Sequence, residues 1–496
     1  MKDVLLVVDL GTTSIKCLAF DLEGSLLCKS VQSNCTVYPH PGWVEQDPDY
    51  WWAAACKGIR ECIALLNHIP GSKIAGISFA GQMSAPVFLD KNGYPLCSSI
   101  LVADVRSAVQ SKWLNQHMGD QFLSLTSNRP IDAFTVCKLL WLKETHPDLY
   151  NQVNTFLLPK DYLRYRLTDR LATDPTDASN TLLYQYGTLQ WNNELICACG
   201  LSPNIFPEII PSASICGIVT SEASQATGLP QGTPAITGAA DMACSQIGSG
   251  ALDSNCLAIT LSTSIQMVAA SNIPKSEDND GAFTYHQSVV LSKAYKMASI
   301  FSGGSGAEYA YRLLYGKDEG SLTSHDYTIM SDAINLSRPS PVLFMPFLTG
   351  SGSPHFNNAD LASWVGISAS TTRHTMMQSA LEGIGYNIRE NLLYFDNQHK
   401  NITLGGGGSN LSCWPPLLAN ILGRDIHLLE HYDAAGLGAL ALGIAALEGK
   451  EFESELVSSL VKTNNVVSPV LEVSQQYDVL YKKYLDLYEA LAIFRK

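Results

Sequence analysis

The first group of residues that could do chemistry is an acidic residue followed by a short hydroxylic turn. Asp9 directly follows an apolar run at residues 5–8, and the turn contains Gly11, Thr12 and Thr13. A carboxylate at the end of a buried strand can hold Mg²⁺ directly or through water, and glycine and threonine groups offer donors to phosphate oxygens. The segment therefore predicts a site for phosphate and metal. An ordinary hairpin with a polar turn is the alternative.

The second group is a run of four glycines, residues 405–408. It contains Gly406 and Gly407, follows an apolar strand, and precedes Asn410 and a helical stretch at residues 414–422. Consecutive glycines lose much chain entropy on folding, so such a run is useful where a flat ring or a ribose lies against bare backbone. It indicates a nucleotide site. A flexible linker is the alternative, although linkers are seldom placed between a strand and a helix.

The third candidate is Asp241, a single carboxylate that follows Gly238, Ala239 and Ala240 at the end of a strand. Small neighbours leave room for a substrate, and partial burial would raise the pKa of the carboxyl towards that of a useful general base. An aspartate that caps the N-terminus of a helix is the alternative.

Two further groups of side chains follow apolar runs that indicate strands, at residues 74–79 and 100–102. The first group is Gln82, Met83 and Ser84, and the second is Asp104 and Arg106. Polar groups at strand ends often line a site in α/β folds. An ion pair on the surface is the alternative for the second group.

The elements that must position these residues occur twice. Strands are expected at residues 5–8, 15–22 and 25–29, and again at 256–261 and 265–270, where the intervening turn is Ser-Thr-Ser. Helical spacing predicts helices at residues 47–66, 327–336, 372–394 and 414–422. Both halves therefore begin with a strand, a hydroxylic turn and a strand, which indicates duplicated domains with a boundary near residues 245–255. Alternating strands and helices predict a mixed α/β architecture.

The composition excludes several classes of protein. The chain has 496 residues, of which 46% are hydrophobic and 16% charged, as expected for a globular protein of two or three domains. Its 32 Lys and Arg against 46 Asp and Glu give a net charge of −14, which disfavours nucleic acid and anionic membranes. No apolar run is long enough for a signal peptide or a membrane span. The 13 cysteines are scattered, so we expect a cytoplasmic protein with reduced thiols.

Together, these segments resemble the FGGY carbohydrate kinases, a family that includes xylulokinase, gluconokinase, ribulokinase and glycerol kinase. The resemblance covers nearly the whole chain. Its segments, in family order, are residues 9–13, 42–48 (Gly-Trp-Val-Glu-Gln-Asp-Pro), 81–83, 138–141 (Lys-Leu-Leu-Trp), 158–163 (Leu-Pro-Lys-Asp-Tyr-Leu), 238–241 and 405–408. The segment from residue 157 to 178 looks closest to the xylulokinase branch.

The resemblance implies an α/β fold of two actin-like (ribonuclease H-like) domains with a cleft between them, residues 1–245 and 246–496. Sugar would bind mainly to the first domain and ATP to the second. The implied reaction is ATP-dependent phosphorylation of a sugar hydroxyl, with a ketopentose such as D-xylulose as the leading substrate. ATP and Mg²⁺ are the implied cofactors, a homodimer is the expected assembly, and neither nucleic acid nor membrane is expected as a partner.

The resemblance also implies a role for each candidate residue. Asp241 matches the general base, and Asp9 matches the acid that holds Mg²⁺, here expected to act through water. The other positions are Gly11, Thr12, Thr13 and Lys16 around the phosphates; Gln82, Met83, Ser84, Asp104 and Arg106 around the sugar, together with Asp241; and Thr263, Gly304, Glu308, Gly406, Gly407 and Asn410 around the nucleotide.

The sequence departs from the xylulokinase pattern at four places. Ser84 stands where His is usual, and Val102-Ala103 stands where Trp-Asn precedes the aspartate. Residues 350–354 are Gly-Ser-Gly-Ser-Pro in place of Gly-Glu-Arg-Thr-Pro, and residues 262–264 are Ser-Thr-Ser in place of Gly-Thr-Ser. The first two changes remove an imidazole and a ring from the sugar pocket, so gluconate and ribulose stay as alternative substrates.

Two hypotheses from other classes are weaker. An actin-like ATPase would hydrolyse ATP without a sugar, but such proteins lack the segments at residues 42–48 and 81–83. A non-catalytic sugar sensor would have lost its reactive groups, whereas this chain keeps both Asp9 and Asp241.

Overall fold

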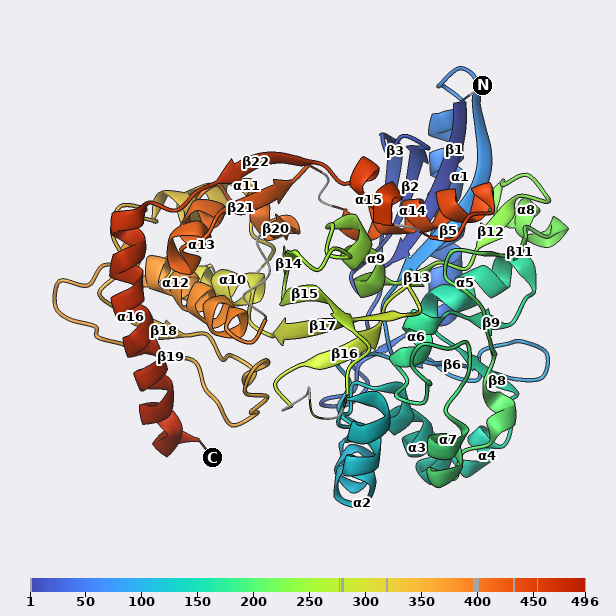
Figure 1. Cartoon of the computed structure of the whole chain (residues 1–496), viewed down its shortest axis with the longest axis horizontal. Coiled ribbons are helices and arrows are strands. Elements are labelled where there is room, and N and C mark those ends of the chain that lie inside the picture. The colour runs from blue at the N-terminus through green and yellow to red at the C-terminus, as the bar shows by residue number, and fades with distance from the viewer. Residues whose placement is uncertain are drawn as a thin grey trace.

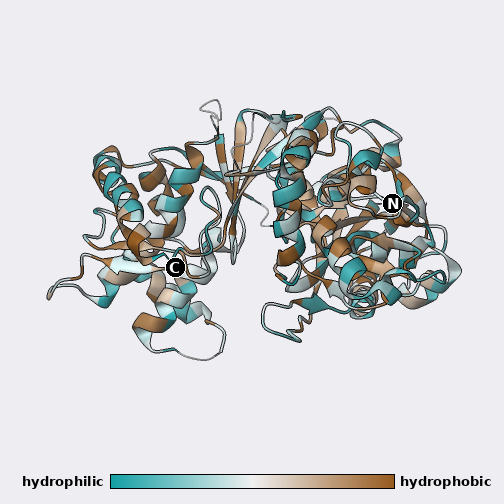
Figure 2. Ribbon diagram, turned by 90° about the horizontal axis from the view of Figure 1, so that it is seen from below, coloured by the Kyte–Doolittle hydropathy of each residue, from teal (hydrophilic) through white to brown (hydrophobic). Residues whose placement is uncertain are grey.

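The chain folds into two lobes that lie side by side (Figure 1). The computed structural model describes residues 2–275, 277, 281–317, 320–395, 401–430, 433–452 and 454–495. The first half of the chain forms the right-hand lobe in Figure 1, and most of the second half forms the left-hand lobe. The same two lobes can be distinguished in the view from below, where they meet along one side (Figure 2).

A central sheet forms the core of the first lobe. Its strands lie in the order β11-β12-β5-β1-β2-β3, with β13 also paired to β5. They are β1 (Lys2–Leu10), β2 (Ser14–Asp21), β3 (Leu26–Ser33), β5 (Ser72–Gly81), β11 (Ile215–Ile218), β12 (Pro234–Ile236) and β13 (Ala239–Ala240).

The sheet of the second lobe repeats this topology. Its order is β16-β17-β15-β14-β20-β21-β22. The strands are β14 (Cys256–Leu261), β15 (Ile265–Asn272), β16 (Thr284–Gln287), β17 (Lys293–Ile300), β20 (Asn401–Gly405), β21 (Ile426–Leu429) and β22 (Thr463–Val467). The series β3-β2-β1-β5-β12 and β17-β15-β14-β20-β21 share the same pairings: antiparallel, antiparallel, parallel, parallel. This repeat confirms the predicted duplication and the predicted architecture of two actin-like domains.

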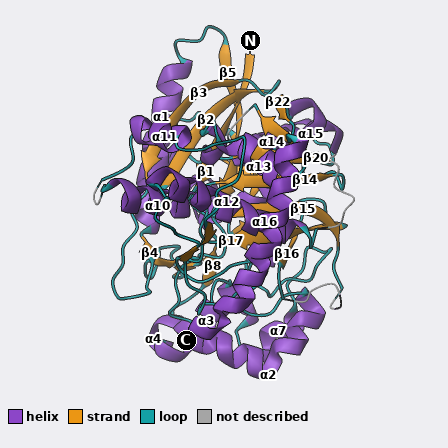
Figure 3. Cartoon of the chain, turned by 90° about the vertical axis from the view of Figure 1, so that its left-hand side faces the viewer, coloured by secondary structure: helices purple, strands orange, loops and turns teal. Residues whose placement is uncertain are grey.

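Short strand pairs and helices surround the two sheets. The pairs are β4 (Glu45–Gln46) with β7 (Ser99–Ile100), β6 (Val87–Leu89) with β8 (Thr155–Leu157), β9 (Ala172–Thr173) with β10 (Glu208–Ile209), and β18 (Leu343–Met345) with β19 (Ser363–Val365). The helices of the first half are α1 (Pro48–Leu66), α2 (Ala108–Thr126), α3 (Thr135–Thr145), α4 (Pro147–Tyr150), α5 (Pro159–Thr168), α6 (Pro175–Ser179), α7 (Asn193–Ala198), α8 (Ser221–Thr227) and α9 (Asp241–Gly248). Those of the second half are α10 (Gly304–Tyr315), α11 (Ser324–Asp332), α12 (Arg373–Leu392), α13 (Trp414–Leu422), α14 (Ala434–Glu448), α15 (Ser454–Leu460) and α16 (Leu471–Ala490). Figure 3 shows α16 in front of the strands of its lobe, on the outside of the molecule.

Burial on both faces explains the continuous apolar sequence of β1. Leu6 and Val8 pack on the face covered by α1, whereas Leu5 and Val7 pack against α9 and α14 on the opposite face. Because successive side chains of a strand point to opposite faces, a strand in the middle of a covered sheet has no position for a polar residue. Polarity returns at Asp9, where the strand reaches the edge of the core.

Most predicted elements are confirmed, and two are wrong. The helix expected at residues 327–336 runs instead over Ser324–Asp332, because Thr323 and Asp326 form a capping box that starts it earlier. The strand expected at residues 100–102 is the two-residue β7, Ser99–Ile100. The chain turns directly after it, since Asp104 N–H donates to the carbonyl of Leu101.

One helix of the second half packs on the first lobe. The side chains of Leu437 and Leu440 on α14 join the same apolar cluster as Leu5 and Val7 of β1. Gly443 of α14 permits this approach, because a Cβ there would lie 2.2 Å from a methyl group of Leu5. The expected domain limits at residues 245 and 246 stay a prediction.

Two further observations bear on the sequence expectations. No helix of the described residues is long and apolar enough to cross a membrane. All 13 cysteines lie among the described residues, and each is a free thiol.

Candidate active site

The ends of three parallel strands bring the two candidate aspartates to one edge of the first sheet. In the register of β1 and β5, Asp9 pairs with Ala80, and in that of β13 and β5, Ala240 pairs with Gly81. Asp9 and Asp241 therefore flank the end of β5 from its two sides. Parallel strands end at the same edge of a sheet, which is why the two positions meet although they lie far apart in the sequence.

Asp9 is buried at this edge and pairs with a lysine. Lys16 Nζ lies 3.2 Å from Asp9 Oδ2 and 3.1 Å from an oxygen of Asp433, the residue that precedes α14. Burial raises the pKa of Asp9 to about 6, with the nearby charge of Asp433 adding to the effect and Lys16 opposing it. Carboxylate oxygens are the donors that Mg²⁺ prefers, so Asp9 and Asp433 fit a magnesium ion chemically. Asp433 was not a candidate from the sequence.

Asp241 begins α9 and is not the cap of that helix. The N-cap position is Ala240, and the Asp241 carboxylate accepts a hydrogen bond from the N–H of the next residue, Met242, at 2.7 Å. The capping interpretation is therefore wrong. Burial raises the pKa of Asp241 to about 7, the negative charge of Asp9 contributes, and the Met242 N–H opposes the rise. A carboxyl with this pKa can take up a proton near neutral pH.

The turn after β1 presents its two threonines to solvent. Thr12 and Thr13 are exposed, and the N–H of Gly11 closes the turn by donating to the carbonyl of Ser14 at 3.0 Å. The turn is supported from below by Gln46, whose amide donates to the carbonyl of Thr12 at 2.7 Å. The arrangement leaves both threonines at the surface, where the Thr13 hydroxyl can meet phosphate oxygens.

Gln82 supports the same turn. Its amide nitrogen donates to the side-chain oxygen of Gln46 at 2.9 Å, and its own oxygen accepts from the Thr12 hydroxyl at 3.1 Å. The residue is 3% exposed. Gln82 therefore uses its polar atoms inside the protein, beside the candidate phosphate turn.

Met83 and Ser84 continue from Gln82 but face different surroundings. Met83 is partly buried, and the hydroxyl of Tyr295, from the second sheet, lies 4.0 Å from its sulfur. Ser84 is buried with a φ of 62°. Its hydroxyl donates to the carbonyl of Asn180 at 3.3 Å, and its own carbonyl accepts from the Lys138 ammonium at 2.7 Å.

Asp104 and Arg106 form a buried ion pair, so the surface interpretation is wrong. The exposed fractions of their side chains are 0% and 3%, and their closest contact is 2.7 Å. The Arg106 guanidinium also lies 3.8 Å from the ring centroid of Trp43 and 2.8 Å from an oxygen of Glu45. Asp104 accepts from the N–H of Val44 at 2.5 Å. The pair braces the turn at residues 42–45, and Asp104 has no exposed oxygen.

The candidate nucleotide residues meet at the carboxyl ends of two parallel strands in the second lobe. Strands β14 and β20 pair Thr260 with Gly405, so the turn at residues 262–264 lies beside the glycine run. The N–H of Gly304, the first residue of α10, donates to the carbonyl of Ser262 at 2.7 Å. The structure therefore brings Thr263, Gly304 and the glycines together, as predicted.

Two glycines of the run have different reasons to be glycine. Gly406 has a φ of +85°, and a Cβ there would lie 2.4 Å from the carbonyl oxygen of Leu261. A Cβ on Gly407 would meet nothing within 4 Å. Gly406 is therefore needed by the fold, whereas Gly407 leaves open space next to the candidate site. Asn410, which follows in the short 3-10 helix Gly407–Asn410, is exposed.

Glu308 lies one turn along α10 from Gly304. Its carboxylate accepts a hydrogen bond from the Tyr327 hydroxyl at 2.6 Å. The residue is half-buried on the side of α10 that faces α11.

The family follows from a comparison with known proteins. A model of the FGGY family of carbohydrate kinases, N-terminal domain, matches residues 4–248, and a model of its C-terminal domain matches residues 258–447. The chain belongs to this family. It is therefore a carbohydrate kinase.

Individual relatives match the kinase over its full length. It is 29% identical over 489 residues to a xylulose kinase of Staphylococcus xylosus, with 97% of this chain and 99% of the relative covered. It is 25% identical to a gluconokinase of Bacillus licheniformis over 502 residues, with 99% of this chain and 96% of the relative covered. The crystal structure of a xyloylose kinase from Brucella ovis superposes with a TM-score of 0.88 at 28% identity, covering 98% of this chain and 99% of that one.

A large cavity of the kinase lies away from these residues. It has a volume of about 970 Å³, and its lining includes Cys256, Lys293 and Asn401. These are the first residues of β14, β17 and β20. The cavity therefore lies at the edge of the second sheet opposite to the glycine run, and it contains none of the candidate residues.

Proposed function

We propose that this carbohydrate kinase transfers the terminal phosphoryl group of ATP to a hydroxyl of a ketopentose, with D-xylulose as the leading substrate and Asp241 as the general base. Support for the substrate comes from the xylulose kinase of Staphylococcus xylosus, which matches over nearly the whole of both chains. The segment at residues 157–178 points to the same branch of the family.

The observation that carries the catalytic assignment is the position of Asp241, which flanks the end of β5 on the side opposite to Asp9. Burial raises the pKa of Asp241 to about 7, which makes the carboxylate a stronger base than an exposed aspartate and leaves a substantial fraction of it deprotonated at neutral pH. In the proposed reaction the sugar hydroxyl gives its proton to Asp241 as the oxygen attacks phosphorus. Phosphoryl transfer otherwise depends on positioning and on charge neutralisation, which the surrounding groups supply.

The phosphates and the metal would be held at the first sheet. Asp9 would hold Mg²⁺, and Lys16 would neutralise negative charge beside Asp9. The exposed turn at Thr12 and Thr13 would bind phosphate oxygens, with the Thr13 hydroxyl as a donor and the Thr12 hydroxyl joining it only by leaving Gln82. When bound, Mg²⁺ neutralises charge on the phosphates. Asp433 would join this group from the second half of the chain.

The sugar-side residues divide into two kinds. Met83 is partly exposed and would contact the sugar directly. The polar atoms of Gln82, Asp104 and Arg106 are already bonded inside the protein, so we propose that these three hold the pocket in shape. Ser84 would select the sugar by the space that a serine leaves where an imidazole is usual.

The nucleotide would bind at the second lobe. Gly407 and Thr263 border open space there, and Gly304 offers the N-terminus of α10. Glu308 lies one turn along α10 from Gly304, and Asn410 ends the 3-10 helix that begins at Gly407. Both would contact the nucleotide from its edge.

A different acceptor, such as gluconate or ribulose, is the second candidate. Ser84 and Ala103 leave more room than the residues usual in xylulokinases, and a gluconokinase is among the full-length relatives. Both candidates share the catalytic aspartates and differ only in the pocket.

A substrate panel decides between them. ADP release is measured with D-xylulose, D-ribulose, other pentuloses and hexuloses, polyols and gluconate, each at saturating Mg²⁺ and ATP. The highest kcat/KM for D-xylulose supports the proposal, and the highest value for gluconate replaces it by the second candidate. ADP release at the same rate without any sugar would indicate an ATPase and overturn both.

Three broader assignments belong to the same proposal. The two domains would divide near residue 245, the kinase would work in the cytoplasm, where free thiols persist, and it would form a homodimer. Size-exclusion chromatography with light scattering tests the last of these.

A further inference from the structure

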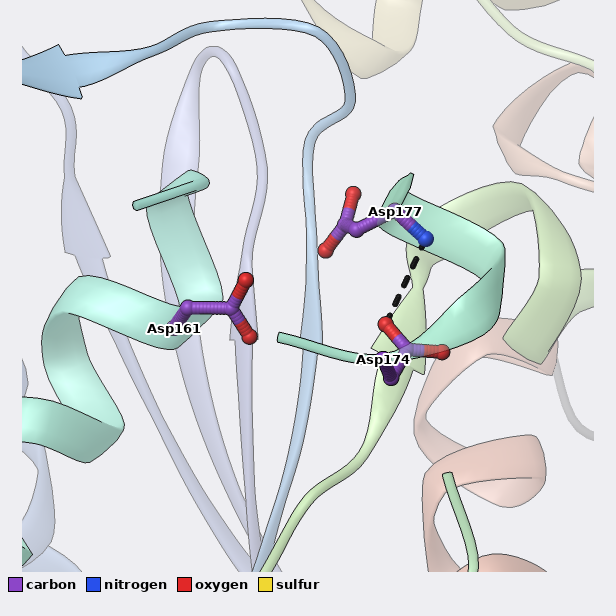
Figure 4. A group of neighbouring side chains, drawn as sticks. All are labelled: Asp161, Asp174 and Asp177. Atoms are coloured by element: carbon purple, nitrogen blue, oxygen red, sulfur yellow. Dashed lines mark hydrogen bonds between the residues drawn. The ribbon is translucent and has the colours of Figure 1, made fainter. Parts of the chain in front are cut away.

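A group of fully buried charges lies beside the segment that carries Asp241. Lys160 Nζ is 2.6 Å from an oxygen of Asp161, 2.9 Å from one of Asp174 and 3.0 Å from one of Asp177. All four side chains have an exposed fraction of 0%. Figure 4 shows Asp161, on α5, facing Asp174 and Asp177 at the start of α6. The lysine ammonium supplies the cation that three such carboxylates need.

Such a group is costly in a protein interior and must be well paired to persist. Each buried ion loses its hydration, so an ion pair in a core adds little net stability and is better explained by the geometry that it imposes. Arg164 supplies a second positive charge, 2.8 Å from Asp161. Burial opposes ionisation of Asp174, but Lys160 and the hydroxyls of Ser212 and Thr176 outweigh it and lower its pKa. Asp174 is therefore a carboxylate that can only accept hydrogen bonds.

A hydrogen-bond chain runs from this group to the catalytic segment. The Thr176 hydroxyl donates to Asp174 at 2.7 Å and accepts from the backbone N–H of Ala240 at 2.9 Å. The direction of both bonds is fixed, because a carboxylate cannot donate and a backbone N–H cannot accept. Ala240 is the residue directly before Asp241. The chain thus holds the peptide from which the Asp241 side chain extends.

Two further contacts hold the start of the same segment. Arg164 donates to the carbonyl of Thr237 at 2.7 Å, and the N–H of Gly238 donates to the carbonyl of Ser212 at 3.0 Å. The Ser212 hydroxyl in turn donates to Asp174 at 2.6 Å. Residues 237–240 are therefore bound at both ends to the buried charges.

We propose that Lys160, Asp174 and Thr176 act as a positioning device for Asp241, fixing the place of its carboxylate relative to the sugar hydroxyl. The device rests on the proposed function, since it matters for turnover only if Asp241 is the base. Its members do not touch the reacting atoms, so they are positioning residues. Displacement of a reacting group by about 1 Å can reduce a rate about 100-fold.

Thr176→Val tests the device, because valine keeps the shape of threonine and removes the hydroxyl. Thr227→Val is the matched control. The Thr227 hydroxyl, on α8, is equally buried, donates to the carbonyl of Ala223 at 2.6 Å and accepts from the N–H of Leu229 at 3.2 Å. Neither partner belongs to residues 237–241, the segment that leads to Asp241. Both variants thus lose one buried hydroxyl and leave one backbone N–H unpaired. Steady-state kinetics, ATP binding and melting temperature are measured for both.

Thr176→Val should lower kcat about 10- to 100-fold relative to Thr227→Val, with a similar melting temperature and an unchanged Kd for ATP. Thr176→Ser, which keeps the hydroxyl, should recover most of the loss. Equal kcat values in the two valine variants overturn the device, as does a serine variant as slow as the valine variant. If Thr176→Val does not fold, the smaller Thr176→Ala replaces it, judged by the same comparison. Asp241→Asn is measured alongside: if it keeps wild-type turnover, the proposed base is wrong, whereas an inactive Asp241→Asn beside a fully active Thr176→Val refutes only the device.

Discussion

Replacing Asp241 by asparagine keeps the size of the side chain and removes its ability to take up a proton. Loss of a positioned general base typically lowers the rate of the chemical step about 10²- to 10⁴-fold. We expect kcat of Asp241→Asn to fall within this range, while the Kd for ATP stays that of the wild type, because Asp241 is not among the residues proposed to bind the nucleotide or its phosphates. The assay is coupled ADP release at saturating ATP with the best sugar of the panel.

The wild-type pH profile gives an independent check. The base works only when it is deprotonated, and burial together with the charge of Asp9 raises the pKa of Asp241 to about 7. We therefore expect kcat/KM for the sugar to fall about tenfold for each pH unit below that value. The positive charge of bound Mg²⁺ favours the carboxylate, so higher Mg²⁺ concentrations should move this fall to lower pH.

The same pKa predicts the effect of the substitution on stability. The folded state favours the protonated carboxyl, so the stability that the neutral group contributes is lost as the pH rises from about 4 through 7. A pKa near 7 in the folded state, in place of 3.8, corresponds to a loss of at most about 4 kcal/mol in the free energy of unfolding once the pH is above 7. Because Asp241 is partly exposed to solvent, we expect a loss of about 2 kcal/mol. Asparagine is neutral throughout. Asp241→Asn should therefore melt about 4–8 °C above the wild type at pH 8, with a smaller difference at pH 5.

Two results would refute this reasoning. A variant that keeps more than roughly a tenth of wild-type kcat is not missing its base. A difference in melting temperature that is the same at pH 5 and pH 8 would show that the carboxyl has no unusual pKa in the folded state. Asp253→Asn is a suitable control for both measurements, because it removes an aspartate at the far edge of the second sheet, in the lining of the large cavity.

Three further substitutions test the other parts of the site. Asp9→Asn should raise the Mg²⁺ concentration needed for half-maximal turnover more than it changes the KM of the sugar; a Mg²⁺ titration that matches the wild type, with unchanged kcat, would leave Asp9 a structural role only. Gly406→Ala should lower the free energy of unfolding by about 1–3 kcal/mol, because the residue has a φ of +85° and the new Cβ would lie 2.4 Å from the carbonyl oxygen of Leu261. Gly407→Ala should keep the wild-type melting temperature and raise the KM for ATP, because its Cβ would enter open space. Equal melting temperatures for the two alanine variants would contradict that distinction. Ser84→His should change the ratio of kcat/KM for D-xylulose to that for the next-best sugar by about 2- to 13-fold, which corresponds to the free energy of one hydrogen bond. Histidine tolerates the φ of 62° at this position, so the variant should fold. An unchanged ratio in a folded, active variant would show that residue 84 does not select the sugar.

The sequence predicted the parts of the site that depend on strand ends. Asp9 follows an apolar run that is typical of a central strand, and Asp241 follows a short stretch of small residues, Gly238-Ala239-Ala240, that forms the two-residue strand β13 beside β5. The glycine run was recognisable because four glycines between a strand and a helix have few structural explanations. These features are local in sequence, and the fold only had to bring them together.

The remaining parts depend on contacts that no local pattern reveals. Asp104 and Arg106 have the composition of a surface pair, and their burial depends on tertiary contacts such as the packing of Trp43 against the guanidinium. Asp433 directly precedes a helix of small residues, α14, and Asp241 is the first residue of α9. This similar placement of an aspartate at a helix start was the signal that could have identified Asp433. Lys160 and its three aspartates were part of a recognisable segment, but the partners of a buried charge are set by tertiary structure. The early start of α11 could have been predicted from the sequence, because Thr323 and Asp326 have the spacing of a capping box.

The position of α14 has a consequence for how the chain is made. The first sheet is complete as a hydrogen-bonded unit once β13 has been synthesised, yet one of its faces is covered by a helix that begins only at Ala434. At about 5–20 residues per second, translation leaves that apolar face without α14, and covered by α9 alone, for on the order of ten seconds or more. During this interval Leu5 and Val7 of the nascent first lobe lack their contacts with Leu437 and Leu440 of α14. The chain therefore cannot finish its first domain before it has nearly finished its second.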